Sequence, residues 1–426
     1  MNKILGLVLI VAVISSSLAQ SPIGVSDGNA IIPMQSNGLP AINTPFVDAA
    51  FNNTTIRRIT NYMETGQWGA HVYSQLQAFS PDNSFILIIE DGFYIIKNRI
   101  TLATVLVLSD INTPRWHPDL PNTIVAYDSN GDTTLRVVYI DVITGSSNVV
   151  FTFPDLYEQI RGNQSFDELS HDGKWIAGMA STSDGDQMIF SLDLENGLIG
   201  TQLRLSDLFA INTNANFEPD WIGVSPLGNY LTVQWVPANP NQRLNGMEIY
   251  EITTGNFVQQ LNPWHNHGDF GLDHDGNEVF ISSILASPED NNLPAIVSYG
   301  LPLRNNDPQL VLTVPWETLW HISCQGLQGR CVVSSGATGM NFNNEIFELY
   351  FDGSVRRLTH HRSGMCGYWV QPRASVSKDG KFIVFDSDFQ DDGGINSCAS
   401  QGQFGGGDVF MIELPIENII FVNGFE

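Results

Sequence analysis

The chain has 426 residues, which is enough for two average domains or for one large closed β-fold. Its 45 acidic residues outnumber its 19 basic ones and give a formal net charge of −26. This charge argues against a nucleic-acid partner, because a polyanion would repel the protein.

The first twenty residues have the pattern of a secretory signal peptide. Lys3 precedes an apolar run over residues 4–14, and small residues follow up to Ala19. About eleven apolar residues are too few to cross a bilayer, and no later apolar run is long enough. We therefore predict a signal peptide over 1–19, no membrane span in the mature chain, and a secreted or periplasmic protein. Residues 20–50 are expected to form an extended leader rich in Gly, Pro and Asn.

One short phrase recurs along the rest of the chain: an apolar or Ser residue, a turn, and then a run of β-forming residues. The six intervals between Ser80 and Ser377 average about 50 residues. A period of this length, with an Asp-Gly type of turn in each unit, is typical of a β-propeller. We predict an all-β, seven-bladed β-propeller with four-stranded antiparallel blades over residues 51–415. We call each copy an anchor phrase. The anchor phrases lie at 79–83, 116–119, 169–173, 224–228, 272–276, 376–380 and, in degraded form, 323–330.

The last unit indicates how the ring closes. It supplies strands at 381–386 and 408–414, and the chain then nearly ends. Residues 56–60 repeat the pattern of 355–359, which we assign to the outermost strand of a blade. A strand near residues 55–60 should therefore complete the last blade and remove the open sheet edge.

Four cysteines in an exported chain predict two disulfides, with three possible pairings. Cys324 and Cys331 flank the degraded sixth repeat, whereas Cys366 and Cys398 lie on either side of the central strands of the seventh. We favour the pairing 324–331 with 366–398.

The anchor phrase at 376–385, with Leu358 and Thr359 upstream, resembles the repeat of TolB-type propellers, a WD40-like repeat. The resemblance covers about residues 50–414, but proteins with such repeats differ in function. The end of the chain, 416–426, is predicted to be a C-terminal tail. Its closing Gly-Phe-Glu is similar to tails of exported proteins of Gram-negative bacteria, which suggests such a source.

A more particular resemblance is to oligogalacturonate lyases, seven-bladed propellers that hold a divalent metal with several His and a Gln. His267 and Gln371 each stand six residues before an anchor, so we expect both side chains to face the channel. The resemblance implies a divalent metal (Mn, Zn or Ca) held by His267, His321 and Gln371. The sequence departs from the family pattern at Arg373, because an arginine beside Gln371 would repel a metal ion.

A sugar lyase needs a base and a cation that neutralises the carboxylate of a uronate. The catalytic candidates are His267 or His321 as the base and Arg373 as the cation, with Arg362 as the alternative cation. Alternatively, the histidines bond backbone carbonyls in loops and the aromatic residues fill gaps between blades. Asp-rich segments such as 386–392 are interpreted as turns or solvated loops, any of which could hold a looser calcium site. The candidate binding residues are Trp264, His265, Trp320, Tyr368, Trp369 and Arg362.

The leading hypothesis is an exported, monomeric propeller that binds a protein or carbohydrate ligand across one face of its ring. The alternatives are a metal-dependent polysaccharide lyase and a scaffold protein of the cell surface, so an enzymatic activity is left open. The loops before each anchor would form the binding face, at 71–73, 218–221, 264–269, 320–321 and 368–373.

Overall fold

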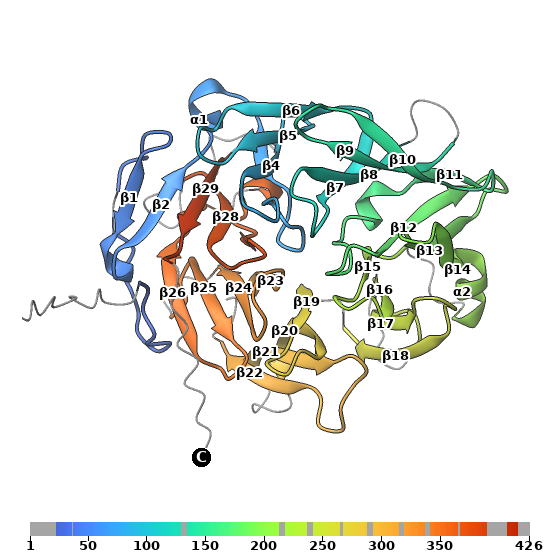
Figure 1. Ribbon diagram of the computed structural model, residues 1–426. Coiled ribbons are helices and arrows are strands. Elements are labelled where there is room, and N and C mark those ends of the chain that lie inside the picture. Colours follow the sequence, from blue (N-terminus) through green and yellow to red (C-terminus); the bar gives the residue numbers. More distant parts are fainter. Residues whose placement is uncertain are drawn as a thin grey trace, which may run out of the picture.

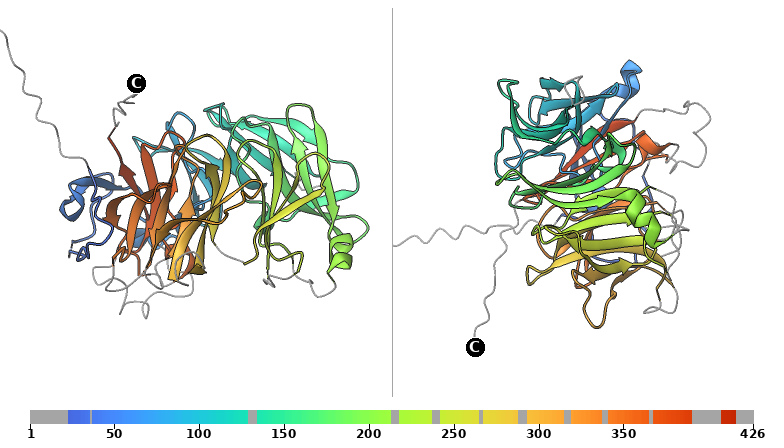
Figure 2. Two further views of the ribbon diagram at one scale, coloured as in Figure 1. Left: turned by 90° about the horizontal axis from the view of Figure 1, so that it is seen from below. Right: turned by 90° about the vertical axis from the view of Figure 1, so that its right-hand side faces the viewer.

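The computed structural model describes residues 23–35, 37–128, 134–212, 218–236, 242–264, 267–287, 293–314, 319–336, 341–364, 367–389 and 407–415. Within this part of the chain the strands form seven antiparallel sheets, which stand around a central axis (Figure 1). Side views show the sheets packed face to face around the ring (Figure 2). The chain is thus an all-β seven-bladed propeller, as the repeat predicted.

Six blades have four strands, numbered in chain order. The first two blades contain β3 (Gly69–His71), β4 (Phe85–Glu90), β5 (Phe93–Asn98), β6 (Thr104–Leu108), β7 (Ile111–Trp116), β8 (Thr123–Asp128), β9 (Arg136–Asp141) and β10 (Ser147–Thr152). The third and fourth contain β11 (Tyr157–Ile160), β12 (Trp175–Thr182), β13 (Gln187–Asp193), β14 (Leu198–Arg204), β15 (Trp221–Val224), β16 (Tyr230–Trp235), β17 (Gly246–Glu251) and β18 (Phe257–Asn262). The fifth and sixth contain β19 (Gly268–Leu272), β20 (Glu278–Ser287), β21 (Leu293–Gly300), β22 (Gln309–Thr313), β23 (Leu319–Ser323), β24 (Arg330–Ser335), β25 (Glu345–Tyr350) and β26 (Val355–His360).

The anchor phrase recurs because its serine closes the turn between the innermost strand and the next one. In the last blade the Ser377 hydroxyl lies 2.9 Å from Asp379 Oδ1, and it accepts the backbone N–H of Phe382 at 3.0 Å. The same pair of contacts surrounds Ser80 and Ser170. The turn also needs a left-handed residue, and Gly380 supplies it with φ +70°.

The last blade closes the ring with strands from both ends of the chain. Its sheet runs in the order β1 (Pro45–Asp48), β2 (Thr54–Arg58), β29 (Asp408–Glu413), β28 (Phe382–Ser387) and β27 (Ser375–Val376). Pairing of β2 with β29 confirms the predicted closure near residues 55–60. Strand β1 adds a fifth strand that the repeat did not predict.

The leader lies along β26 rather than apart from the ring. Val25 forms a β-bridge with Arg357, whose guanidinium donates to the carbonyls of Asp27 and Ala30 at 2.8 and 2.7 Å. The ring of His360 lies 3.0 Å from the carbonyl of Ile32. The backbone of the leader thus finds partners on the sixth blade.

Apolar side chains of neighbouring blades interlock and form the cores between them. The disulfide between Cys324 and Cys331 is present, as predicted, and links the end of β23 to β24 in the sixth blade. Cys366 and Cys398 lie outside the described residues. None of the described helices has the length and apolar character that a membrane span requires. The helices are α1 (Tyr62–Thr65), α2 (Leu205–Ile211), and the 3-10 turns η1 (Ala49–Phe51), η2 (Gly162–Gln164) and η4 (Tyr368–Val370).

Candidate functional site

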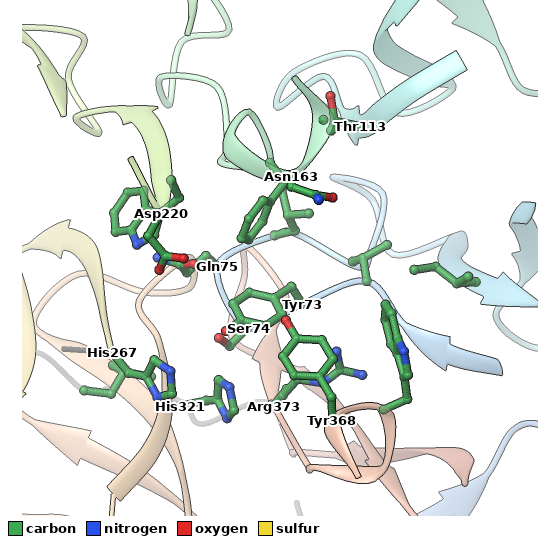
Figure 3. Close-up of a pocket in the computed structure, with 18 of the residues that line it drawn as sticks. Tyr73, Ser74, Gln75, Thr113, Asn163, Asp220, His267, His321, Tyr368 and Arg373 are labelled. Carbon is green, nitrogen blue, oxygen red and sulfur yellow. The ribbon is translucent and has the colours of Figure 1, made fainter. Parts of the chain in front are cut away.

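A cavity of about 530 Å³ lies at one mouth of the ring, and every blade contributes to its wall (Figure 3). We call it the axial cavity. The segments that precede the anchor phrases, which we predicted to form the binding face, supply most of the lining. Its polar and aromatic lining includes Tyr73, Ser74, Gln75, Asn112, Thr113, Asn163, Phe166, Asp220, Trp221, His267, His321, Tyr368, Trp369 and Arg373.

Two predicted catalytic histidines meet in this cavity. The rings of His267 and His321 are stacked, with centroids 4.7 Å apart and an interplanar angle of 17°. His321 is buried, and neither of its ring nitrogens has a hydrogen-bond partner in the described part of the chain. Burial, assisted by His267 and Arg373, holds its pKa well below the usual range. His321 is therefore neutral and a weak base, whereas His267 is exposed at the cavity.

Arg373 is the cation of the cavity wall. Its side chain is fully buried and lies 2.7 Å from Asp386 on β28, which also accepts the backbone N–H of His71. The Nε and Nη1 atoms of Arg373 have no hydrogen-bond partner among the described residues. Burial raises the pKa of Asp386 to about 7, although the positive charge of Arg373 lowers it in part.

Asp386 corrects one prediction made from the sequence. The segment 386–392 was assigned to turns or solvated loops, although Asp386 was also predicted to end the strand 381–386. The structure places Asp386 within β28, where it is 1% exposed, so it belongs to the strand and is not solvated. It is buried because a charged partner from another segment, Arg373, meets it there. The remainder of that segment from residue 390 lies outside the described residues.

Aromatic rings enclose the guanidinium of Arg373. Its Cζ lies 5.8 Å from the ring centroid of Tyr73 and 5.0 Å from those of Tyr368 and Trp369. Tyr73 and Tyr368 are stacked with centroids 6.4 Å apart, and Phe166 meets Tyr73 edge-on. The wall thus combines a buried cation with flat apolar faces.

Other predicted residues lie elsewhere. Gln371 and Trp264 do not line the axial cavity, and Trp264 is 51% exposed. Arg362 is buried outside the cavity and donates to the carbonyl of Gln35 at 2.6 Å. His265 lies outside the described residues. Trp320 belongs to β23, and the structure describes only its backbone.

The described residues do not fit a metal ion. They contain no group of three or more His, Cys, Asp or Glu side chains placed to hold one. The stacked rings of His267 and His321 are nearly parallel, so their nitrogen lone pairs do not converge on one point. Arg373 adds a positive charge close to them. Catalytic zinc sites, by comparison, use three protein ligands around the ion.

Sequence reasoning missed several residues that complete the cavity. Asn163 and Thr113 extend its polar wall opposite the row formed by His267, His321 and Arg373 (Figure 3). Gln75 also lines the cavity, and its Nε2 donates to the carbonyl of Gly268 at 3.0 Å. No alternation in the sequence indicated Gln75, because residues 72–76 follow the end of β3 and all of them line the cavity.

Fold and cavity together define a seven-bladed propeller with a ligand-sized hollow at one mouth of its ring. Two solved oligogalacturonate lyases are similar to the chain. The one from Vibrio parahaemolyticus has a TM-score of 0.58 and 12% identity, over 88% of this chain and 96% of that one. The other, in complex with manganese, has a TM-score of 0.59 and 15% identity, over 90% and 99%.

TolB from Acinetobacter baumannii matches over 68% of this chain and 62% of its own, with 16% identity and a TM-score of 0.35. No family model matches the chain, and no curated protein matches it. At these identities the likeness to the lyases establishes the fold and nothing finer.

Proposed function

We propose that the protein is an exported propeller that binds an acidic carbohydrate in the axial cavity. The observation that carries this proposal is the buried guanidinium of Arg373, which lies inside a wall of aromatic rings. Two of its nitrogen atoms have no hydrogen-bond partner among the described residues. A carboxylate is the group that such a guanidinium binds best, because both its oxygens can accept hydrogen bonds. The flat faces of Tyr368 and Trp369 suit the apolar face of a sugar ring.

The polar groups of the cavity support the same ligand. Asn163, Thr113 and Gln75 offer amide and hydroxyl groups that can bond sugar hydroxyls. A small number of such groups on a mostly apolar wall is typical of small-molecule sites. A volume of about 530 Å³ is within the range of these sites.

Calorimetric titration with matched sugars tests this proposal. Galacturonate oligomers and neutral galactose oligomers of the same length differ at the carboxylate. The expected result is saturable binding of the acidic series and at least about tenfold weaker binding of the neutral series. Equal affinity for both series, or binding of neither, contradicts the proposal.

A lyase activity is a second candidate, favoured by the placement of His267 at the cavity near Arg373. In such a reaction His267 takes the C5 proton beside the uronate carboxylate, and Arg373 neutralises that carboxylate. The electron pair forms the C4–C5 double bond, the C4–O bond breaks, and the departing sugar oxygen gains a proton. The unsaturated product absorbs in the ultraviolet, so a growing absorbance on pectic or alginate fragments tests the activity.

A manganese-dependent version of this activity has less support, because the described residues contain no group of three or more side chains placed to hold a metal ion. It would use His267 and His321, but the third predicted ligand, Gln371, does not line the axial cavity. Elemental analysis of gently purified protein tests for a bound divalent metal. A metal-free preparation that is inert on these fragments rules out the metal-dependent lyase.

Export and a monomeric state belong to the same proposal. Cleavage after Ala19 and a mature chain outside the cytoplasm are expected. N-terminal sequencing of the protein from culture fluid or periplasm, with size measurement in solution, tests both. An uncleaved chain in the cytoplasm contradicts export without affecting the binding proposal.

A further inference from the structure

A second cavity, of about 160 Å³, lies toward the other end of the innermost segments. Tyr73 lines the axial cavity, whereas Gln77, four residues later, lines the second one. The turns of the anchor phrases supply much of the remaining wall. Its lining includes Trp116, Glu168, His171, Gln325 and Lys378. We call it the turn-side cavity.

The turn-side cavity presents hydrogen-bond acceptors that lack a cation. Glu168 accepts the backbone N–H of Gln77, and no described Lys, Arg or His forms an ion pair with it. Burial raises the pKa of its carboxyl to about 7, so the anion is poorly stabilised. The charges of Arg115 and Lys378 lower this pKa from a distance, without forming an ion pair with the carboxyl. The ammonium of Lys378 instead lies 3.0 Å from the carbonyl of Pro118 and 3.3 Å from Asp119.

Gln77 provides an independent sign of a missing ligand. The residue is 8% exposed, and its Nε2 donates to the carbonyl of Gln325 at 3.5 Å. Its Oε1 is buried and has no hydrogen-bond partner in the described part of the chain. A buried acceptor of this kind costs free energy unless a donor reaches it.

We propose that the turn-side cavity binds a primary ammonium group of a small aliphatic amine, with Glu168 and Gln77 Oε1 as acceptors. An ammonium has three N–H donors and a positive charge, so it can satisfy both atoms at once. Trp116 and Leu169 contribute apolar surface for a short carbon chain. A metal ion suits the cavity less well, because the described residues place no third carboxylate or imidazole there.

Titration with n-butylammonium, followed by calorimetry, tests the site. Choline serves as the matched probe, since it carries the same charge but has no N–H donor. The unaltered protein should bind n-butylammonium, and choline should bind at least about tenfold more weakly. Absence of n-butylammonium binding, or equal affinity for the two cations, overturns the proposal.

Two variants test whether n-butylammonium binds in this cavity. Glu168→Gln keeps the shape of the side chain and should weaken n-butylammonium binding at least about tenfold, with the folded state checked by circular dichroism. Lys378→Met should strengthen binding, because it removes a like charge from the rim. Lys381→Met is the matched control: its side chain is 42% exposed, close to the 41% of Lys378, but it does not line the cavity.

The Lys378 variant keeps the test informative if Glu168→Gln fails to fold. An unchanged affinity in Lys378→Met, or the same increase in Lys381→Met, overturns the assignment to this cavity. The outcome is independent of sugar binding, because the probe, the cavity and the variants all differ from those of the axial cavity.

Discussion

The guanidinium of Arg373 lies 2.7 Å from the carboxylate of Asp386, and neither side chain is exposed by more than 1%. Arg373 has a φ of +40°, a backbone conformation that costs a non-glycine residue about 1–3 kcal/mol. The ion pair and the hydrogen bond from the His71 N–H to Asp386 hold this conformation in place. The cavity therefore presents its positive charge in a fixed position.

Substitution of that arginine should reduce the affinity for an acidic sugar. In Arg373→Gln the carboxylate of the ligand loses its charged partner, so we expect at least about tenfold weaker binding of galacturonate oligomers. Arg357→Gln is the matched control, since Arg357 is also buried and lies 2.5 Å from Glu345, but outside the cavity. Calorimetric titration of both variants measures the effect. An equal loss of affinity in the control would show that the loss reflects stability instead of direct contact.

Closure of the ring should depend on one buried ion pair. Asp408 lies 2.6 Å from Arg58 and also accepts the Thr60 hydroxyl at 2.8 Å. Arg58→Met leaves that carboxylate without its cation and should lower the free energy of unfolding by about 3–5 kcal/mol. Arg57→Met is the neighbouring control, because its pair with Glu413 is partly exposed and should contribute less than about 1 kcal/mol. Urea denaturation measures both, and similar losses would contradict this role of Arg58.

The architecture could be predicted because its signal is local. Each anchor turn depends on contacts within five residues, as around Ser377, so every copy leaves the same trace in the sequence. The closing strand was likewise visible, because residues 56–60 repeat the pattern of 355–359. The leader's contacts with β26 left no such trace, because they join residues more than 300 positions apart. Strand β1 pairs with the nearby β2, but as the fifth strand of its sheet it has no counterpart in the other blades.

The site could be predicted only in part, because equal spacing from the anchors fails in the last blade. The innermost strand there, β27, has two residues and follows the 3-10 turn η4. The offset that correctly placed His267 at the cavity therefore selected Gln371, whereas Arg373 is the residue that lines it. Its partner Asp386 comes from the next strand and could be identified only from the three-dimensional structure.

Gly223 on β15 should not tolerate a side chain. A Cβ at this position would lie 1.7 Å from Oδ2 and 2.5 Å from Cγ of Asp167. Relief of this clash requires movement of a buried side chain, so Gly223→Ala should lower the free energy of unfolding by about 1–3 kcal/mol. Gly38→Ala is the control, because no heavy atom lies within 4 Å of its Cβ position. Thermal unfolding measures both, and unchanged stability of Gly223→Ala would contradict the close packing of Asp167.

The carboxyl of Asp167 should make stability fall as the pH rises. Burial raises its pKa from 3.8 to about 8, and the neighbouring Glu168 acts in the same direction. Between pH 4 and 8 the Asp167 carboxyl is protonated in the folded chain but ionised in the unfolded chain. The stabilisation from this group is therefore complete below pH 4 and is lost as the pH rises toward 8. Asp167→Asn does not titrate. The free energy of unfolding of the original protein relative to this variant should therefore fall between pH 5 and 8, by up to about 1.4 kcal/mol per unit.

Asp184→Asn provides the control for this pH dependence. Hydrogen bonds from Arg204 and Thr182 hold the pKa of Asp184 at about 2, so its carboxylate remains ionised throughout pH 5–8. The stability difference between the original protein and Asp184→Asn should thus stay flat over this range, as measured by urea denaturation at each pH. A flat difference for Asp167→Asn as well would mean that Asp167 is ionised in the folded chain. An ionised carboxylate at this buried position would require a cation beside it, because burial of an unpaired charge costs several kcal/mol.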